Sequence, residues 1–181
     1  MRIIAGEARS RTIVAPPGRD TRPTLDRVRE NLFNILQNRV RGARTLDLFA
    51  GSGALSLEAV SRGAADAVLA DHDRAAIEAE KRNIAALGFE GRTRVIQADW
   101  QAAVRTLEAE GALFDLIFLD PPYAMRDLTD VTLRLTPLLA QGALIVIEHE
   151  ARVAPAVADA YEQTDHRKYG YAGVSFFRAR V

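Results

Sequence analysis

The stretch that decides the fold is Leu46-Asp47-Leu48-Phe49-Ala50-Gly51-Ser52-Gly53, in which a short apolar run ends in a glycine-rich turn. A helical pattern near Ala54–Ser61 follows directly, so the turn joins a predicted strand to a predicted helix. Two glycines at such a turn let the backbone approach a ligand closely and aim amide N–H groups at it. Tight packing alone also explains many glycine turns, so the interpretation depends on the rest of the chain.

Downstream of this turn, strand patterns alternate with helical patterns. We predict strands at Leu46–Ala50, Ala67–Ala70, Arg94–Gln97, Leu113–Leu119 and Ala143–Glu148. The predicted helices lie near Ala54–Ser61, Asp73–Leu87, Gln101–Glu110 and Leu128–Leu139. Such alternation predicts a parallel sheet with helices on both faces. The nearly uninterrupted apolar runs Leu116–Leu119 and Leu144–Ile147 are typical of central strands that are buried on both faces.

The C-terminal end has a different pattern. Tyr161–Lys168 and Val174–Arg180 flank Tyr169-Gly170-Tyr171-Ala172-Gly173 and predict an antiparallel hairpin. The expected fold is therefore α/β, a doubly wound, mostly parallel seven-stranded sheet that ends in an antiparallel C-terminal hairpin. We expect a single compact core over residues 45–181.

Residues 1–44 predict a small N-terminal extension. Arg2–Ala5 and Thr12–Val14 look like short extended pieces, and Thr24 is a candidate N-cap for a helix. The apolar positions of that helix follow helical spacing and are Leu25, Val28, Leu32, Ile35 and Leu36.

The composition narrows the class of protein. A chain of 181 residues that is 48% hydrophobic can form one domain with a substantial core. The absence of cysteine excludes disulfides, thiolate zinc sites and cysteine nucleophiles, and the three scattered histidines argue against a metal centre. No apolar run is long enough for a membrane span, and the charged start does not resemble a signal peptide. We therefore expect a cytoplasmic protein without membrane contact.

The overall charge of zero hides an asymmetry along the chain. Residues 1–44 hold ten arginines and four acidic residues, a surplus of 10 − 4 = 6, so the remainder carries 0 − 6 = −6. Arginine binds phosphate with two parallel hydrogen bonds and stacks on bases, so the basic N-terminal segment predicts a polyanionic partner. An arginine-rich proteome would also explain it. The candidate contacts to this partner, which the family resemblance described below identifies as RNA, are Arg9, Arg11, Arg19, Arg22, Arg27 and Arg29.

Three carboxylates follow the first three strands, where ligands of doubly wound sheets bind. Asp47 suits a cationic amino group, Asp71 can take both hydroxyls of a ribose, and Asp99 can accept a hydrogen bond from an adenine amine. Asp99 could instead be a helix N-cap. Amino acid, ribose and adenine together predict S-adenosylmethionine. The candidate cofactor contacts are Asp47, Phe49, Ala50, Gly51, Ser52, Gly53, Asp71, His72, Asp99 and Trp100, although His72 also fits an exposed loop position.

The candidate catalytic segment is Asp120-Pro121-Pro122-Tyr123, directly after the most apolar strand. The Asp120 carboxylate and the Pro121 carbonyl could hold both hydrogens of an exocyclic base amine and free its delocalised lone pair. Two prolines keep the turn rigid, because each fixes φ and lacks an N–H. Tyr123 offers a face on which the target base can stack, worth roughly 1–3 kcal/mol. The alternative is that the segment is merely a turn.

With these residues assembled, the chain resembles the bacterial 16S rRNA guanine-N2 methyltransferases of the RsmD family, over nearly its whole length. The resemblance is carried by the glycine turn, the Asp-Pro-Pro-Tyr segment and an N-terminal signature. That signature comprises Arg2–Gly6, Arg9 to Arg11, Arg22-Pro23-Thr24, Asp26–Glu30 and Leu32-Phe33-Asn34. This signature distinguishes the RsmD family from other amino-methyltransferases, because the other two motifs occur in many of them.

The resemblance implies a Rossmann-like methyltransferase core, S-adenosylmethionine as donor and S-adenosylhomocysteine as product. It implies a guanine of 16S rRNA as target, within the small subunit or an assembly intermediate, and a monomeric enzyme without metal. Three positions depart from the family's pattern: Asp71 stands where glutamate is usual, and Ser10 and Ser56 replace glycines. The alternatives are DNA adenine-N6 methylation, a non-catalytic RNA-binding factor and, less well matched, a nicotinamide oxidoreductase.

Overall fold

The structure is a computed structural model that describes residues 1–18 and 23–180. Its helices are α1 (Pro23–Val40), α2 (Ala54–Ser61), α3 (Arg74–Leu87), α4 (Trp100–Ala109) and α5 (Thr129–Leu135), with short 3-10 turns at η1 (Glu90–Arg92) and η2 (Thr136–Leu138). Its strands are β1 (Arg44–Asp47), β2 (Asp66–Asp71), β3 (Thr93–Gln97), β4 (Phe114–Leu119), β5 (Leu139–Glu150), β6 (Tyr161–Tyr169) and β7 (Ala172–Ala179).

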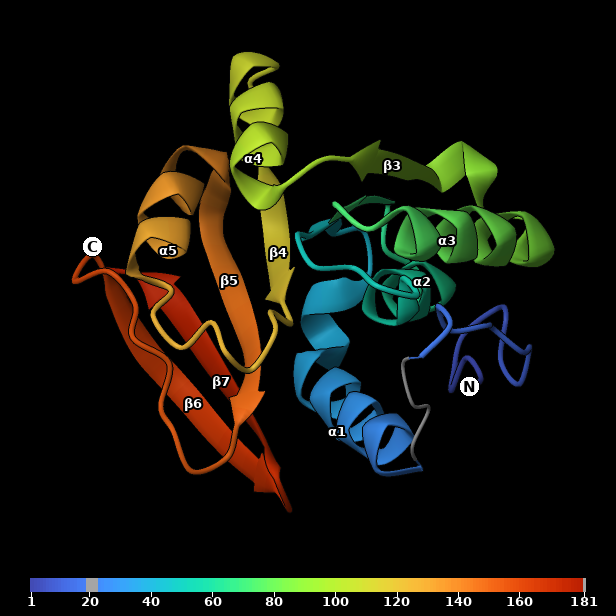
Figure 1. The fold of residues 1–181 in the computed structure, drawn as a ribbon, viewed down its shortest axis with the longest axis horizontal. Helices are drawn as coiled ribbons and strands as arrows, with labels where there is room; N and C mark the ends of the chain where they lie inside the picture. The colour runs from blue at the N-terminus through green and yellow to red at the C-terminus, as the bar shows by residue number, and fades with distance from the viewer. Residues whose placement is uncertain (19–22, 181) are drawn as a thin grey trace.

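The strands form one seven-stranded sheet in the order β3-β2-β1-β4-β5-β7-β6 (Figure 1). Strands β1 to β5 pair in parallel, and β7 pairs antiparallel with both β5 and β6. The predicted fold class is confirmed, including the C-terminal hairpin. The order reverses between β1 and β4, which makes the carboxyl ends of these two strands the switch point of the sheet.

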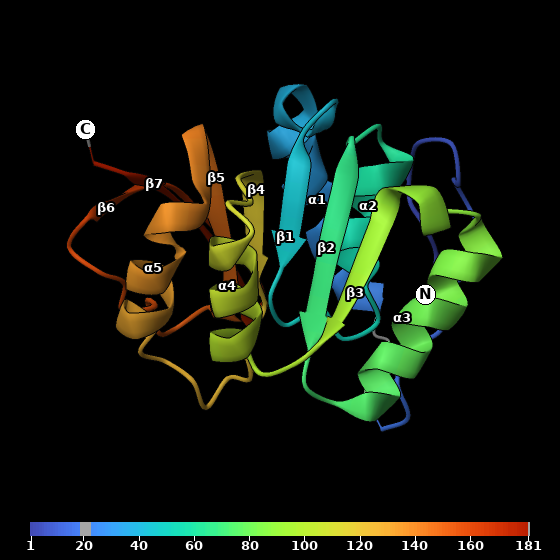
Figure 2. The same ribbon diagram turned by 90° about the horizontal axis from the view of Figure 1, so that it is seen from above.

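Helices cover both faces of the sheet. Helices α1 and α2 lie on one face and α4 and α5 on the other (Figure 2). Successive residues of β2 show how the strands serve both layers: Val68 and Ala70 belong to the apolar cluster under α4 and α5, whereas Ala67 and Leu69 pack against α2 and α3. The near-continuous apolar runs of β4 and β5 are buried for this reason, as expected of central parallel strands.

Helix α1 packs on β4, β5 and β7. Its buried apolar positions are Val28, Leu32, Phe33, Leu36 and Val40. The prediction placed Ile35 in this stripe, but Ile35 is 40% exposed and Phe33 is fully buried instead. At 100° per residue, Phe33 falls on the side of the stripe shared with Val40, and Ile35 falls outside it. The predicted cap is also corrected: the helix begins at Pro23, so Thr24 lies inside it, because proline is well suited to a first helical position.

Hydrogen bonds join the N-terminal segment, residues 1–18, to α2. Glu58, fully buried, accepts hydrogen bonds from the backbone N–H groups of Ile4 (2.8 Å) and Ala5 (3.0 Å), and the Ser61 hydroxyl accepts one from Ala8 N–H (3.0 Å). A Cβ on Gly6 would lie 1.8 Å from the Ser61 carbonyl oxygen, so this contact requires glycine. The two predicted extended pieces meet in a single antiparallel bridge between Arg2 and Thr12.

Two boundaries differ from the prediction for local reasons. Strand β1 ends at Asp47, so residues 48–50 already belong to the turn. The predicted helix over Leu128–Leu139 is a short α5 followed by η2, because Pro137 cannot donate the N–H that a longer helix needs. Ser10, one of the departures from the family's glycine pattern, adopts a left-handed φ of 68°.

Candidate functional site

The carboxyl ends of the parallel strands gather the candidate residues on one edge of the sheet. Asp47 ends β1, Asp71 ends β2 and Asp120 follows β4. The parallel register pairs Asp47 with Leu69 on one side and with Phe118 on the other. All three acids therefore lie at the same edge of the sheet, with Asp47 and Asp120 at the switch point between β1 and β4.

The glycine turn after β1 is shaped by close packing. Gly51 and Gly53 have φ angles of 57° and 77°, in the left-handed region that favours glycine. A Cβ on Gly53 would come within 2.7 Å of the Leu69 side chain, so this position also lacks space. The Asn83 amide donates to the Ser52 carbonyl (2.9 Å) and braces the turn from α3.

Asp71 is 4% exposed and organises the backbone around it. Its Oδ2 accepts from Gly51 N–H and its Oδ1 from Asp73 N–H, both at 2.9 Å. Each carboxylate oxygen keeps a second lone pair for a ribose hydroxyl. The side chain of His72 is 74% exposed, with its Nδ1 3.6 Å from Asp71 Oδ1, so its placement agrees with the loop interpretation.

Asp99 and Trp100 begin α4. The Asp99 Oδ1 accepts from Ala102 N–H at 2.8 Å, which is an N-cap bond, and the residue is exposed. Trp100 is half-buried and packs against the apolar cluster beneath α4 and α5. The structure therefore shows the capping role that competed with adenine binding, while the second carboxylate oxygen leaves that prediction open.

Asp47 is the most perturbed acid of the site. It is 1% exposed, and within the described residues its Oδ1 has no hydrogen-bond partner. Burial, and to a smaller extent the nearby Asp120, raise the pKa of Asp47 to about 8, because the Phe49 backbone and the Ser56 hydroxyl counter only part of the effect. A positive group beside this carboxylate would stabilise its ionised form and lower its pKa again.

A cleft of about 700 Å³ opens beside Asp47. Its lining residues come from the N-terminal segment, α1, the glycine turn and the ends of β4 and β5, and they include Met1, Pro16, Arg29, Asp47, Phe49, Gly51, Ser52, Asp120 and Glu148. Arg29 is 4% exposed, and its Nε has no hydrogen-bond partner among the described residues. A buried carboxylate and a buried guanidinium thus line the same cleft, which suits a ligand that carries both an ammonium and a carboxylate.

The Asp120–Tyr123 segment connects β4 to the loop before α5. The Pro122 carbonyl accepts from Met125 N–H at 2.8 Å, which closes the turn, and Tyr123 is 49% exposed. A second hollow of about 300 Å³ lies against Pro121, Pro122 and Tyr123 and is also lined by Glu148. Asp120 therefore lies beside the cleft, whereas Tyr123 presents its ring on the neighbouring hollow.

The N-terminal arginines lie in different surroundings. Arg9 and Arg27 are exposed, and Arg11 donates to the carbonyls of Ala86 and Leu87 at the end of α3. Arg19 and Arg22 lie outside the described residues.

The structure places Arg29 in surroundings that do not fit the predicted RNA contact. It donates to Asp26 (3.1 Å) and to the Arg2 carbonyl (2.5 Å), and its Nε lies 3.6 Å from buried Glu58. A buried guanidinium held in this way is not available to external phosphates. Arg29 is therefore a residue of the cleft and not a candidate RNA contact.

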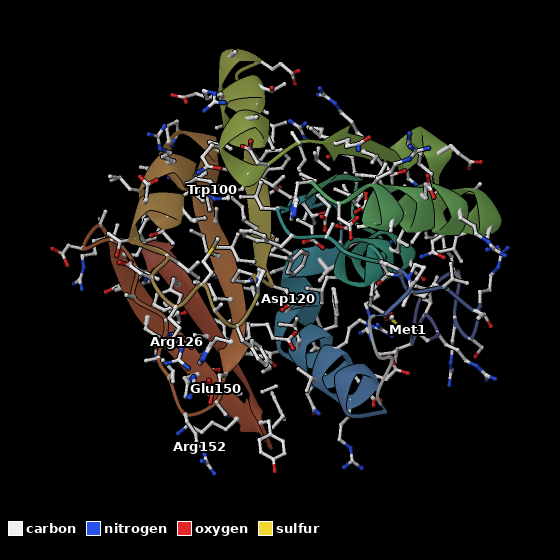
Figure 3. All side chains as sticks on the ribbon, in the orientation of Figure 1. Met1, Trp100, Asp120, Arg126, Glu150 and Arg152 are labelled. Atoms are coloured by element: carbon white, nitrogen blue, oxygen red, sulfur yellow. The ribbon has the colours of Figure 1, made fainter. Side chains whose placement is uncertain are left out.

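Several exposed groups near the site were missed. Arg126, Glu150 and Arg152 gather near the carboxyl end of β5, with Asp120 above them in the same view (Figure 3). Arg126 lines the second hollow and lies 3.4 Å from Glu150, and Tyr171, at the hairpin turn, is 83% exposed. The sequence offered no local signal for them, because they come from the end of β5 and from loops that follow different strands.

Glu148 was also missed, although a signal existed. It follows the apolar run Leu144–Ile147 just as Asp120 follows Leu116–Leu119.

In the described residues, no helix is long and apolar enough to cross a membrane, and no group of three or more His, Asp or Glu side chains could hold a metal ion.

Comparison with known proteins decides the family. A protein-family model described as "Conserved hypothetical protein 95" matches residues 1–178. The chain is 42% identical over 153 residues to ribosomal RNA small subunit methyltransferase D of Escherichia coli (strain K12), covering 83% of this chain and 75% of that protein. The chain belongs to the RsmD family. The ribosomal RNA small subunit methyltransferase D of Haemophilus influenzae is 33% identical over 153 residues, covering 83% of this chain and 79% of that protein.

Solved structures agree with RsmD-family membership. The yhhF protein of Escherichia coli superposes with a TM-score of 0.84 at 36% identity, covering 100% of this chain and 98% of that one. The hypothetical protein TTHA0928 of Thermus thermophilus gives a TM-score of 0.82 at 32% identity, covering 97% and 98%. The N-terminal segment and α1 thus belong to the part of the chain that the family shares.

Proposed function

We propose that the protein transfers a methyl group from S-adenosylmethionine to the exocyclic N2 amine of a guanine in 16S rRNA. The observation that carries this proposal is the meeting of Asp120 and the orphaned Asp47 in one cleft at the switch point of the sheet. Asp120 is suited to hold the amine that accepts the methyl group, and Asp47 is suited to hold the cationic methyl donor. The family's named members support rRNA as the substrate.

The residues present fit the cofactor. Asp47 would take the ammonium of its amino-acid part, since it lines the cleft and one of its buried carboxylate oxygens has no hydrogen-bond partner among the described residues. Arg29 lines the same cleft and would place its positive charge near the cofactor's carboxylate. Asp71 would hold the ribose hydroxyls, and Asp99 the adenine amine. When bound, the cofactor supplies an electrophilic methyl group on a sulfonium, with S-adenosylhomocysteine as the product.

The catalytic segment would prepare the amine. The lone pair of a base amine is delocalised into the ring, so two acceptors that hold its hydrogens favour tetrahedral geometry at nitrogen. The Asp120 carboxylate and the Pro121 carbonyl are these acceptors, and they are preorganised by a turn closed at Pro122. The new N–C bond would form as the S–C bond of the sulfonium breaks, and the proton that nitrogen loses would pass to the Asp120 carboxylate and from there to water. No covalent enzyme intermediate is required.

The target base must reach this segment from outside the molecule. The half-exposed ring of Tyr123 gives it a stacking face, which requires the guanine to be unpaired or flipped. Exposed Arg9 and Arg27 of the N-terminal part, together with Arg126 and Arg152 from the loops after β4 and β5, would contact the flanking phosphates. The cytoplasm, where ribosomal subunits assemble, is the proposed place of action.

The first test is methyl transfer itself. The protein is incubated with radiolabelled S-adenosylmethionine and, in parallel, unmodified small ribosomal subunits, free 16S rRNA and DNA, and the digested nucleosides are identified. We expect N2-methylguanosine from the ribosomal material, and none from Asp120→Ala, which should still bind S-adenosylhomocysteine in calorimetry. Label in DNA as methyladenine would overturn the substrate, and unchanged activity of Asp120→Ala would remove Asp120 from the mechanism.

A further inference from the structure

The inference concerns Glu148, a carboxyl group that lies beside Asp120. Strands β4 and β5 pair in parallel with Phe118 opposite Val146 and Leu119 opposite Ile147. One residue further on, this register places Asp120 beside Glu148, with strands about 4.8 Å apart. Because side chains alternate between faces, both follow Phe118 and Val146 onto the face covered by α1. The two acids therefore leave the sheet side by side into the same cleft.

Glu148 connects the two hollows of the site. It lines the cleft that holds Asp47 and Asp120, and it lines the hollow formed by Pro121, Pro122 and Tyr123. Among the described residues, no side-chain hydrogen bond or ion pair holds its carboxyl group. A base that stacks on Tyr123 with its amine at Asp120 would therefore place the adjoining part of its edge against Glu148.

The charges facing Glu148 come from two elements. Burial and, after it, Asp120, the residue that follows β4, raise the pKa of Glu148, and Arg29 of α1 lowers it. Arg29 is already bound to Asp26 and to the Arg2 carbonyl, so it moderates the charge of Glu148 without occupying its oxygens. A bound sulfonium cofactor would add a positive charge and favour the ionised carboxylate, which offers acceptors only.

The edge of guanine matches this arrangement. Its N1–H donor adjoins the N2 amine, whereas adenine and 2-aminopurine carry an unprotonated acceptor at N1. We propose that Glu148 accepts the N1–H of the target guanine and so acts as the specificity-determining residue of the site. This inference rests on the proposed guanine-N2 activity. An acceptor-only carboxylate would bind guanine and repel a base whose N1 is itself an acceptor.

The test uses a substrate that keeps the reacting amine and changes only N1. RNA carrying guanine, 2-aminopurine or hypoxanthine at the target position is built into the acceptor that the wild-type protein methylates, and kcat/KM is measured for each base. We expect the wild-type protein to prefer guanine over 2-aminopurine by about 10- to 100-fold, the range for one hydrogen bond to a charged group. Hypoxanthine, which lacks the N2 amine, should remain unlabelled.

Glu148→Ala should bring this ratio close to one, because no acceptor then distinguishes the two bases. Glu148→Gln should also lower it, because an amide can turn its N–H group toward an unprotonated N1. Glu150→Gln, two residues further along β5, is the matched control and should keep the wild-type ratio. The ratio compares two substrates on one protein, so partial unfolding cancels. S-adenosylhomocysteine binding to Glu148→Ala should stay within a few-fold of the wild type, about 1 kcal/mol or less.

The outcomes separate the two proposals. A wild-type protein that methylates guanine and 2-aminopurine equally well would overturn the role of Glu148 and leave guanine-N2 methylation intact. So would an unchanged preference in Glu148→Ala, because another group would then read N1. Absence of any N2-methylguanosine from a protein that binds S-adenosylhomocysteine would overturn the proposed function and, with it, this inference.

Discussion

The backbone N–H of Gly51 donates a 2.9 Å hydrogen bond to the Oδ2 of Asp71, which joins the glycine turn after β1 to the end of β2. The other oxygen of the same carboxylate accepts from Asp73 N–H, the residue that caps α3. One buried acid thus holds two neighbouring turns in place, and the glycine turn of the two lines the cleft. Aspartate is short enough to keep both bonds, which gives a physical role to a position where the sequence resemblance expected glutamate.

Asp71→Asn should therefore weaken both the fold and the cofactor site. The amide has one acceptor oxygen for two backbone donors, so one buried N–H loses its partner, at a cost of about 1–3 kcal/mol in the free energy of unfolding. Urea unfolding and S-adenosylhomocysteine calorimetry measure the two effects. The neighbouring His72→Ala is the control, and its unfolding free energy should change by less than about 0.5 kcal/mol. Equal stability of the two variants would contradict this role for Asp71.

Asp47 should make cofactor binding dependent on pH. Its pKa of about 8 lies above the ordinary value of 3.8, so the folded, ligand-free protein holds a proton there at neutral pH. An ammonium placed beside it favours the ionised form, so binding should release up to one proton, and affinity should rise as the pH increases toward 8. Calorimetry in buffers of different ionisation enthalpy counts this proton.

Asp47→Asn is the matched variant for that measurement. It should bind the cofactor more weakly and lose the part of the proton release that Asp47 provides, whereas any contribution from Glu148 should remain. The same shift affects stability in the opposite sense: a raised pKa means that the contribution of Asp47 is largest below pH 3.8 and is lost as the pH rises to about 8. Identical proton release by the two proteins would show that Asp47 does not meet the ammonium.

Two arginines of α1, two residues apart, should behave differently. Arg27 is exposed, so Arg27→Ala should leave the unfolding free energy within about 0.5 kcal/mol of the wild type. It should weaken RNA binding and reduce the salt dependence by about 0.7 log unit per log unit of salt, the value for one single-strand phosphate. Filter binding at several salt concentrations measures this slope.

Arg29→Ala should instead lower the unfolding free energy by about 1–3 kcal/mol, because the hydrogen bond to the Arg2 carbonyl and the ion pair with Glu58 are lost while Arg62 still pairs with Glu58. Its RNA salt slope should stay near the wild-type value while cofactor affinity falls. A lower salt slope in Arg29→Ala with unchanged stability would restore the original expectation that Arg29 contacts phosphate.

A histidine pair, in which His149 is buried and His166 is half-buried, offers a test of packing behind the site. His149 and His166 stack with ring centroids 5.6 Å apart, and both bind the Ser175 hydroxyl at 2.9 Å. A Cβ on Gly173 would lie 2.6 Å from the His149 ring, so Gly173→Ala should displace that ring and cost about 1–3 kcal/mol.

The control for this substitution is Gly91→Ala, where a Cβ meets nothing within 4 Å and should change stability by less than about 1 kcal/mol. Placing Gly173→Ala in a His149→Ala background should remove most of its cost, because the clashing ring is gone. Thermal unfolding of the single and double variants reads this coupling, and additive costs would contradict the assigned clash.

Local patterns predicted the order of strands and helices and the motifs at the strand ends. Uninterrupted apolar runs such as Leu144–Ile147 identify central strands because those strands are buried on both faces. Asp120-Pro121-Pro122-Tyr123 was recognisable because proline restricts the backbone within the segment itself. Helix α2, predicted at Ala54–Ser61, has those bounds in the structure. Signals of this kind depend on neighbours in the sequence, so the sequence by itself determined them.

The tertiary structure alone decided how distant residues share one environment. Arg29 carries the same charge as Arg27, but only the packing of α1 on the sheet and on Glu58 makes it a buried group of the cleft. The raised pKa of Asp47 likewise arises from burial and from Asp120, which is more than seventy positions away in the chain. Burial and electrostatic coupling depend on distance in space, which the order of residues along the chain does not contain.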